Sequence, residues 1–163
     1  VHEGAYPVMV ERLELTRDSS GPGRNRGGAG LRKDVKVLTD AILMNLGERH
    51  QFAPYGLFGG KPGSRAATVL NPGPEERMLH SKGTYQLKHG DVVSFRLAGG
   101  GGYGDPLERE ISAVSHDVKY GYISADNARE EYGVAINPLD LSADEDATEG
   151  LRSELHRIRE CEA

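Results

Sequence analysis

The residues that could bind or activate a ligand lie in glycine-rich stretches of this sequence. Two arginines flank a glycine-rich turn near residue 25, aromatic side chains interleave with glycines near residue 57, and four consecutive glycines precede Tyr103. Paired guanidinium groups on a turn can hold an anion, but we favour the interpretation that they are solvated charges without a ligand. The candidate substrate-binding or interface residues are Arg24, Arg26, Arg49, Tyr55, Phe58, Gly100, Gly101 and Tyr103.

The four-glycine stretch formally matches the dinucleotide-binding fingerprint, as Gly99-x-Gly101-x-x-Gly104 between an expected strand and an expected helix. A true fingerprint continues through its helix into a second parallel strand, which ends in an acidic residue about twenty positions further on. Asp126 stands at roughly that distance, but it falls in the first turn of a second expected helix. We therefore interpret the stretch as backbone that packs closely against another segment or a partner, rather than as a nucleotide site.

No other motif in the sequence indicates catalysis. Lys61 is followed by Pro62, where a phosphate-binding loop needs Ser or Thr to hold magnesium. The six histidines lack the paired spacing that metal sites use, and no Gly-x-Ser-x-Gly elbow is present. We therefore expect no catalytic residue, no metal ligand set and no bound cofactor in this chain.

Composition excludes several classes of partner. The 163 residues carry a net charge of −5, and residues 140–163 account for it with eight acids and three bases. Arginines elsewhere are balanced by acids and aromatics are sparse, which argues against nucleic acid, and no apolar run could span a bilayer. The single cysteine, Cys161, cannot form an internal disulfide, so a cytoplasmic location is expected. Because Val1 leads almost at once into an expected strand, we expect a piece of a longer polypeptide or a processed subunit.

Hydrophobic periodicity predicts six to seven strands, mostly antiparallel, before residue 98. A strand of about ten residues should open at Pro7, with a β-bulge near Glu11 and Arg12 where the apolar parity slips. Residues 41–46 are apolar on both faces, which suits a central strand. The turn His89-Gly90-Asp91 should join two strands as a hairpin. Further strands are expected at 31–37, 66–70, 85–87 and 92–97.

Helical signals follow the glycine stretch. Asp105 and Pro106 suit the N-cap and first position of a helix that should run to Gly121. Ser124 should cap a short helix that stops at Gly133. A capping box, Ser142-Ala-Asp-Glu145, should open a last helix with a narrow apolar stripe. The expected fold is therefore α+β, with a β-rich body over residues 1–137, two or three C-terminal helices, and residues 138–163 as an acidic helical tail.

Five stretches in collinear order resemble the C-terminal part of the hydantoinase B/oxoprolinase family. They span about residues 6–136, whereas residues 138–163 match no pattern of the family. They are Arg17-Asp-Ser-Ser-Gly-Pro-Gly-Arg-Asn-Arg-Gly-Gly-Ala-Gly30, Pro54-Tyr-Gly-Leu-Phe-Gly-Gly60, Gly90-Asp-Val-Val93, Gly-Gly-Gly-Gly-Tyr-Gly-Asp-Pro106, and Val114-x-x-Asp-Val118-x-x-Gly121 with Tyr132-Gly-Val134.

The resemblance implies a place in an ATP-dependent enzyme complex. B-type subunits of this family pair with ATP-using A-type subunits, and together they open cyclic amides such as hydantoin and 5-oxoproline or carboxylate ketones such as acetone and acetophenone. The family's metal ligands and ATP site lie outside the matched region, so ATP, magnesium and a divalent transition metal are expected in other parts. The partners implied are the remainder of the B-type subunit and an A-type subunit, in a hetero-oligomer.

Two roles in such a complex fit this chain. It could be a C-terminal domain or split subunit that is inactive alone, or a purely structural interface subunit that never touches substrate. In either role, Tyr55, Leu57 and Phe58 should be buried by this domain or by a partner, since soluble proteins seldom expose so much apolar area. The stretch 99–104 should be a packing device, with glycines that can adopt positive φ and permit close backbone approach near the rest of the B-type subunit.

Overall fold

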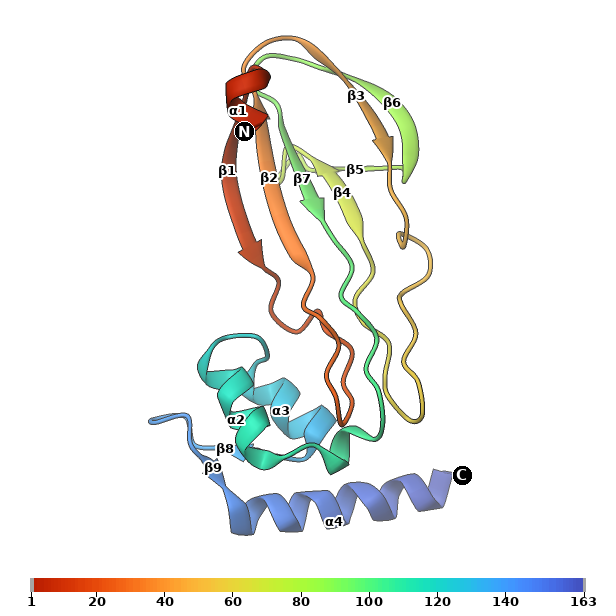
Figure 1. Cartoon of the computed structure of the whole chain (residues 1–163), viewed down its shortest axis with the longest axis vertical. Helices are drawn as coiled ribbons and strands as arrows, with labels where there is room; N and C mark the ends of the chain where they lie inside the picture. The colour runs from red at the N-terminus through yellow and green to blue at the C-terminus, as the bar shows by residue number, and fades with distance from the viewer. Residues whose placement is uncertain (1, 163) are drawn as a thin grey trace.

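The computed structural model describes residues 2–162, an elongated molecule with strands β1 to β7 toward one end and helices α2 to α4 at the other (Figure 1). The elements in chain order are α1 (His2–Ala5), β1 (Val8–Leu15), β2 (Leu31–Val37), β3 (Ala41–Leu46), β4 (Ala67–Leu70), β5 (Arg77–Leu79), β6 (Lys82–Leu87), β7 (Val92–Arg96), the 3-10 turn η1 (Pro106–Glu108), α2 (Ile111–Lys119), α3 (Ala125–Tyr132), β8 (Ala135–Ile136), β9 (Ala143–Asp144) and α4 (Glu145–Glu162). The predicted α+β class is confirmed.

Two antiparallel sheets form the strand half. The larger sheet has five strands in the order β1-β2-β7-β4-β5, and the smaller one pairs β3 with β6. The predicted bulge is confirmed, because the register between β1 and β2 shifts between Val10 and Arg12. An extra residue at this position absorbs the slip in apolar parity and returns the later side chains of β1 to their faces.

The first hydrophobic core lies between the two sheets. Its buried members are Val37, Leu70, Leu79, Leu87 and Val93, with side chains from both sheets packed around them. Burial of this apolar area is what holds a two-stranded sheet in place, since an isolated pair of strands is marginally stable in water.

The prediction that residues 41–46 form a central strand is wrong. The strand β3 has β6 as its only neighbour among the described strands, so it lies at a sheet edge. Its inward side chain Leu43 packs on the core, while Ile42, Met44 and Leu46 point outward and are exposed. The strand is apolar on both faces because one face meets the core and the other presents an uncovered apolar stripe.

The predicted hairpin around Gly90 is also wrong, although the turn itself is present. Gly90 adopts a φ of 91°, as a tight turn requires. The strands on either side do not pair: β6 joins β3, whereas β7 lies between β2 and β4. The turn therefore carries the chain from one sheet to the other, a result of long-range pairing that local sequence cannot show.

Below the sheets, three glycine-rich segments run side by side without forming strands (Figure 1). We call these segments, residues 19–30, 54–63 and 99–104, the glycine bundle. Backbone hydrogen bonds connect them: the Gly100 carbonyl accepts from Gly21 N at 2.7 Å, and Gly102 N donates to the Lys61 carbonyl at 2.9 Å. Lys61 N in turn donates to the Pro22 carbonyl at 2.7 Å, so each segment bonds to the others.

The central segment of the bundle repeats its contacts every three residues. Methyl groups placed on Gly99 and Gly102 would overlap carbonyl groups of the 19–22 segment, one on Gly101 would overlap the Tyr55 carbonyl, and one on Gly100 would approach Gly28. A three-residue repeat is that of a polyproline II helix, and in collagen only glycine fits where such chains meet.

Close approach, rather than left-handed backbone, explains most of these glycines. Of the residues from 99 to 104, only Gly104 has a positive φ, at 75°. Positive φ is therefore used at Gly104 and not at Gly99 to Gly102. At those positions the missing Cβ makes room for a neighbouring main chain.

The first predicted helix is shorter than expected. Asp105 does cap a turn, with its side chain accepting from Leu107 N at 2.9 Å, but this turn is η1 and ends at Glu108. Arg109 is extended, with φ −67° and ψ 138°, and α2 begins only at Ile111. The interruption turns Arg109 toward the glycine bundle, where its guanidinium donates to the Arg24 carbonyl at 3.1 Å.

The other helix boundaries mostly follow the predicted signals. Ser124 caps α3 and accepts from Asn127 N at 3.0 Å, while Gly121 and Gly133 end α2 and α3 with positive φ. The predicted capping box is wrong, because Asp144 instead of Ser142 accepts from the first turn of α4, through Ala147 N at 3.0 Å. Within residues 2–162, no helix has the length and apolar character that crossing a bilayer requires.

A second core holds the helices together. Its buried members are Val114, Val118, Ile123, Ala128, Tyr132 and Val134. The last helix is attached by polar contacts: Arg152 donates to the main-chain carbonyls of Tyr132 at 3.2 Å and Arg109 at 2.6 Å. Contacts between residues 138–163 and the body therefore cross the expected domain boundary.

The bundle predicts unequal responses to alanine at neighbouring glycines. Gly101→Ala should lower the free energy of unfolding by about 1–3 kcal/mol or more, because its methyl group overlaps main chain that cannot move alone. Gly100→Ala, which meets Gly28 N at 3.1 Å, should cost less than about 1 kcal/mol. Gly28→Ala, with nothing within 4 Å, is the control. Urea denaturation of the three variants measures this, and equal losses at positions 100 and 101 would contradict the close-packing argument.

Candidate functional site

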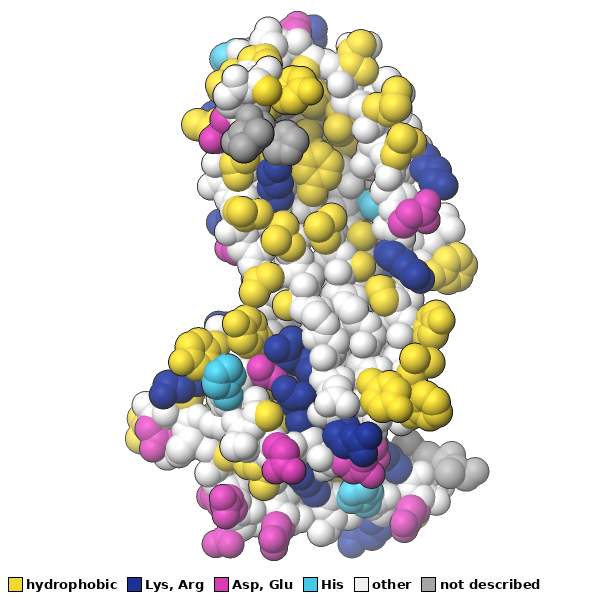
Figure 2. Space-filling model, viewed as in Figure 1, with side chains coloured by type: hydrophobic (Ala, Val, Ile, Leu, Met, Phe, Trp, Pro, Cys, Tyr) yellow, Lys and Arg dark blue, Asp and Glu magenta, His cyan; other side chains and the backbone are white. Residues whose placement is uncertain are grey.

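Four apolar side chains gather at the tip of the glycine bundle. The bundle tip consists of Tyr55, Leu57, Phe58 and Tyr103, and the rings of Phe58 and Tyr103 pack with centroids 5.1 Å apart. Tyr55 and Phe58 are 71% and 77% exposed, so their expected burial by this chain itself is wrong. Figure 2 shows hydrophobic side chains gathered at the lower right, where this loop lies in Figure 1. Burial by a partner stays a prediction.

Arg26 is engaged by an internal carboxylate. Its Nε and Nη2 atoms donate to the two oxygens of Asp117 at 2.8 and 3.2 Å, and its guanidinium lies 5.1 Å from the centre of the Tyr122 ring. Arg109 donates to the same carboxylate at 2.8 Å. With Asp117 buried, these two arginines tie the glycine bundle and the chain before α2 to the helix itself.

Arg24 lies in the glycine bundle, whereas Arg49 lies in the loop after β3. Arg24 is exposed and pairs with Glu108 at 3.5 Å, which contributes little in water. Arg49 has a φ of 62°, an uncommon conformation for a residue with a side chain. The structure therefore brings Tyr55, Phe58 and Tyr103 together and leaves Arg49 apart from them.

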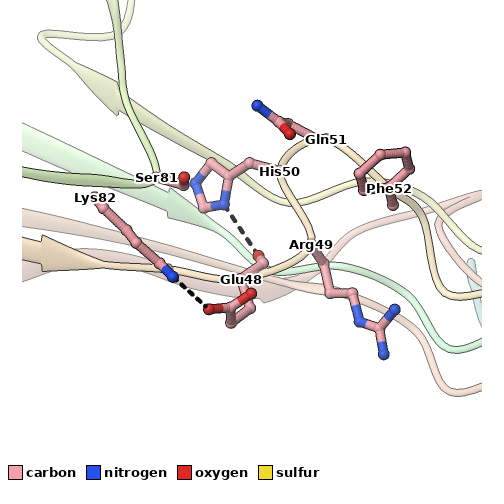
Figure 3. Close-up of a pocket in the computed structure, with 8 residues that line it drawn as sticks. Glu48, Arg49, His50, Gln51, Phe52, Ser81 and Lys82 are labelled. Atoms are coloured by element: carbon pink, nitrogen blue, oxygen red, sulfur yellow. Dashed lines mark hydrogen bonds and ion pairs between the residues drawn. The ribbon is translucent and has the colours of Figure 1, made fainter.

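A hollow of about 620 Å³ surrounds Arg49 in the loop after β3. It is lined by residues 47–52 with Ser81 and Lys82. Figure 3 shows Glu48 and Lys82 paired, at 3.2 Å, and Arg49 directed away from Lys82. The charged groups could hold a polar ligand, but the hollow is open and its one ion pair is exposed.

His50 in this hollow has a structural role. Its Nδ1 lies 3.0 Å from the Glu48 carbonyl and its Nε2 lies 3.2 Å from the Thr68 hydroxyl. A carbonyl can only accept, so Nδ1 carries the proton and Nε2 accepts from Thr68 in the neutral ring. Asn45 donates to the same hydroxyl at 3.2 Å, which closes the network. Both ring nitrogens are thereby occupied by the protein.

A cluster of charged side chains lies on the outer face of the large sheet. Arg32 donates to both oxygens of Asp34, at 3.0 and 2.8 Å, and Arg12 lies 3.9 Å from the same carboxylate. Burial opposes the ionisation of Asp34, but the hydrogen bonds and charge of Arg32 outweigh it and hold the pKa of this carboxyl below its ordinary value. The arrangement stabilises the sheet.

Tyr132 is the one buried phenol in the helical core among the described residues. Burial raises its pKa to about 12, so the hydroxyl is neutral at physiological pH. Across residues 2–162, no three side chains of His, Cys, Asp or Glu come together in a group that could hold a metal ion. The charged groups described above, around Asp117 and Asp34, thus form internal networks.

Comparison with known proteins identifies the family to which this chain belongs. The sequence profile of the Hydantoinase B/oxoprolinase family matches residues 1–106, well over half of the chain. The chain belongs to the hydantoinase B/oxoprolinase family. This family member is 36% identical over 147 residues to the beta chain of the caprolactamase of Pseudomonas jessenii, covering 83% of this chain and 24% of that protein. It is 34% identical to the B component of a putative D-/L-hydantoinase of Pseudomonas sp. strain NS671, covering 82% and 23%.

Solved structures show the same fold. The nucleotide-free acetone carboxylase structure matches with a TM-score of 0.82 at 23% identity, covering 99% of this chain and 26% of that one, and at this identity it shows the fold alone. The ATP-dependent caprolactamase from Pseudomonas jessenii matches with a TM-score of 0.77 at 34% identity, covering 93% and 27%. The match over 99% takes in the helical tail, which sequence patterns had left without a counterpart. The chain spans about a quarter of the length of these relatives.

Sequence reasoning missed the two residues that organise the buried charge network. Asp117 stood in the sequence analysis only inside the motif Val114-x-x-Asp-Val118, and Arg109 only as a residue within an expected helix. A signal was available: Asp117 falls on the apolar side of α2, between Val114 and Val118, where a carboxylate needs a partner. The identity of that partner, ninety-one residues earlier, depends on the tertiary fold.

The charge network predicts a large loss on neutralising its centre. Asp117→Asn should lower the free energy of unfolding by about 3–5 kcal/mol, because two half-buried guanidinium groups lose their counter-charge. Glu130→Gln, an exposed change in the neighbouring helix α3, should stay within about 0.5 kcal/mol. Thermal and urea unfolding of both variants measure the difference, and similar stabilities would refute the role given to Asp117.

The sheet carboxylate predicts a pH dependence. Since the folded-state pKa of Asp34 lies below its unfolded value, its ionised form stabilises the fold above about pH 4, and this contribution is lost as pH falls through the folded pKa. The difference in unfolding free energy between wild type and Asp34→Asn should therefore be largest at pH 6–7 and shrink toward pH 3. A difference that does not change with pH would show that Asp34 acts through packing alone.

Proposed function

We propose that this chain is the C-terminal domain, or a split subunit, of a hydantoinase B-type protein in an ATP-dependent complex that opens cyclic amides. The observation that carries the proposal is 36% identity to the beta chain of a caprolactamase over 83% of the chain, with 34% to a component of a putative hydantoinase. The likeness to acetone carboxylase, at 23% identity, supports the fold. Ketone carboxylation is therefore the second candidate reaction.

Within such a complex, the chain's own role is structural: it shapes the B-type subunit and contacts its other parts. ATP-driven amide opening needs a site for phosphates, a metal to neutralise them and a group that activates water. The described residues offer no metal-binding group, and the hydrogen-bonded charges at Asp117 and Asp34 serve the fold. We assign ATP, magnesium and a divalent transition metal to other parts of the assembly, and no cofactor to this chain.

Uncovered apolar area supports membership of a larger fold. The outward side chains of β3, namely Ile42, Met44 and Leu46, and the bundle tip are all exposed. Soluble proteins rarely leave such patches open unless a partner covers them. Because the chain spans about a quarter of its relatives, the remaining three quarters of the B-type subunit is the partner we assign to the bundle tip.

Reconstitution tests the reaction. The chain alone should show no ATP hydrolysis and no opening of caprolactam, hydantoin or 5-oxoproline. Combined with the remainder of its B-type subunit and the A-type subunit, it should restore ATP-dependent opening of one of these amides, measured as ADP and ring-opened product. Turnover with acetone or acetophenone plus bicarbonate, and with none of the three amides, would favour ketone carboxylation as the reaction. ATP turnover by the isolated chain would contradict the assignment of the chemistry to other parts.

Substitution at the bundle tip tests the interface. Phe58→Ser should weaken, by about tenfold or more, the binding of this chain to the remainder of the B-type subunit, as loss of an aromatic anchor does. Phe52→Ser is the matched control, because Phe52 is equally exposed, at 77%, but lines the separate hollow around Arg49. Calorimetry gives both affinities and unfolding curves confirm that neither variant is destabilised. Equal affinities for the two variants would remove the bundle tip from the interface.

A further inference from the structure

The face of the large sheet that carries the first core is covered over only part of its length. Residues directly opposite in neighbouring strands share a face, so Val35 places Val10 and Val93 on the core side. Toward the start of β1, the small sheet covers this face, and Val37 and Val93 are buried. Toward the glycine bundle, the same face continues beyond that cover.

The uncovered part is apolar. The register pairs Leu15 with Leu31, and Leu97 N donates to the Leu31 carbonyl at 2.8 Å, which puts all three on the core side. Leu13 lies beside them and is 64% exposed, while Leu15 and Leu97 are each 53% exposed. We call Leu13, Leu15, Leu31 and Leu97 the open face. In Figure 2, hydrophobic side chains gather over the strand half of the molecule.

A single cation interrupts the open face. Lys33 pairs across the sheet with Leu13 on one side and Phe95 on the other, so its side chain leaves the sheet among apolar neighbours. No carboxylate of residues 2–162 forms an ion pair with Lys33. An apolar element that covered this face would desolvate the ammonium group, and that is unfavourable unless the element brings a counter-charge.

We propose that an apolar segment carrying one carboxylate, from the remaining three quarters of the B-type subunit, packs on the open face and pairs with Lys33. Three observations select this occupant. The open face continues an existing core, and its cation, which lacks an ion pair within residues 2–162, requires an acid. The relatives are about four times as long as this chain, so they contain further segments that could cover the face. The inference rests on the proposed function and names how the two parts of the subunit join.

Thiol labelling of two neighbouring positions tests the covering of the open face. Leu13→Cys and Glu14→Cys are placed separately in a Cys161→Ser background, because Cys161 is exposed and would react. The two side chains lie on opposite faces of β1, and Glu14 faces Arg32. On assembly with the remainder of the B-type subunit, the maleimide reaction at position 13 should slow at least tenfold, and that at position 14 by less than twofold.

Charge at position 33 tests the chemistry of the occupant. Lys33→Glu should weaken binding to the remainder of the B-type subunit at least tenfold more than Lys33→Met, and the defect should shrink at high salt. Both variants should match the wild type in unfolding, since among residues 2–162 this ammonium has no carboxylate partner to lose. Equal affinities of the Lys33→Glu and Lys33→Met variants for the remainder of the B-type subunit would overturn the proposal that the segment carries a carboxylate.

The outcomes separate this inference from the proposed function. An assembly that forms and turns over substrate, but leaves Leu13→Cys as reactive as in the free chain, would overturn the inference and leave the function standing. Protection that rises with the concentration of the chain alone would identify a second copy as the occupant and overturn it as well. Equal slowing at positions 13 and 14 would indicate general loss of access and count against it. Failure of any assembly to form would overturn both.

Discussion

The absence of side chains at a few glycines is the constraint on which the rest of this structure depends. Main chains of the three bundle segments approach so closely that a methyl group on Gly99, Gly101 or Gly102 would overlap a carbonyl group. The bundle stands between the sheets and the helices, and it owes its order to backbone hydrogen bonds such as that from Gly21 to Gly100. Extended chains outside a sheet can satisfy their backbone groups this way only if nothing separates them.

The bundle joins the two halves because charged groups secure its lower end. Asp117 receives hydrogen bonds from Arg26 in the bundle and from Arg109 before α2, and Arg152 of the last helix donates to the Arg109 carbonyl. A buried carboxylate is tolerated when it is fully paired, and removing one partner leaves the others unsatisfied. The helices are therefore positioned by a network that begins in the glycine segments.

The strand half exposes apolar surface on two of its faces. Its core is well packed where the two sheets meet, yet the same face is open at Leu13 and Leu15, and β3 shows a second apolar stripe to solvent. The chain spans about a quarter of the length of its relatives, and the proposed function assigns the covering of these areas to a partner. Under the proposed function, the chain contributes shape and contact surfaces, and the chemistry is assigned to other parts of the assembly.

The sequence by itself indicated the family through its collinear motifs, and it determined the features that local chemistry controls: the change from strands to helices after residue 98, the bulge near Arg12, and the stops at Gly121 and Gly133. Each depends on the side chains within a few residues, which impose periodicity, caps and turns. Only the tertiary structure decided that β3 is an edge strand, that β6 and β7 do not pair, that the bundle tip is exposed and that Asp117 meets Arg26. These depend on which distant segments pack together, and an apolar strand has the same sequence pattern whether its second face meets this chain or another.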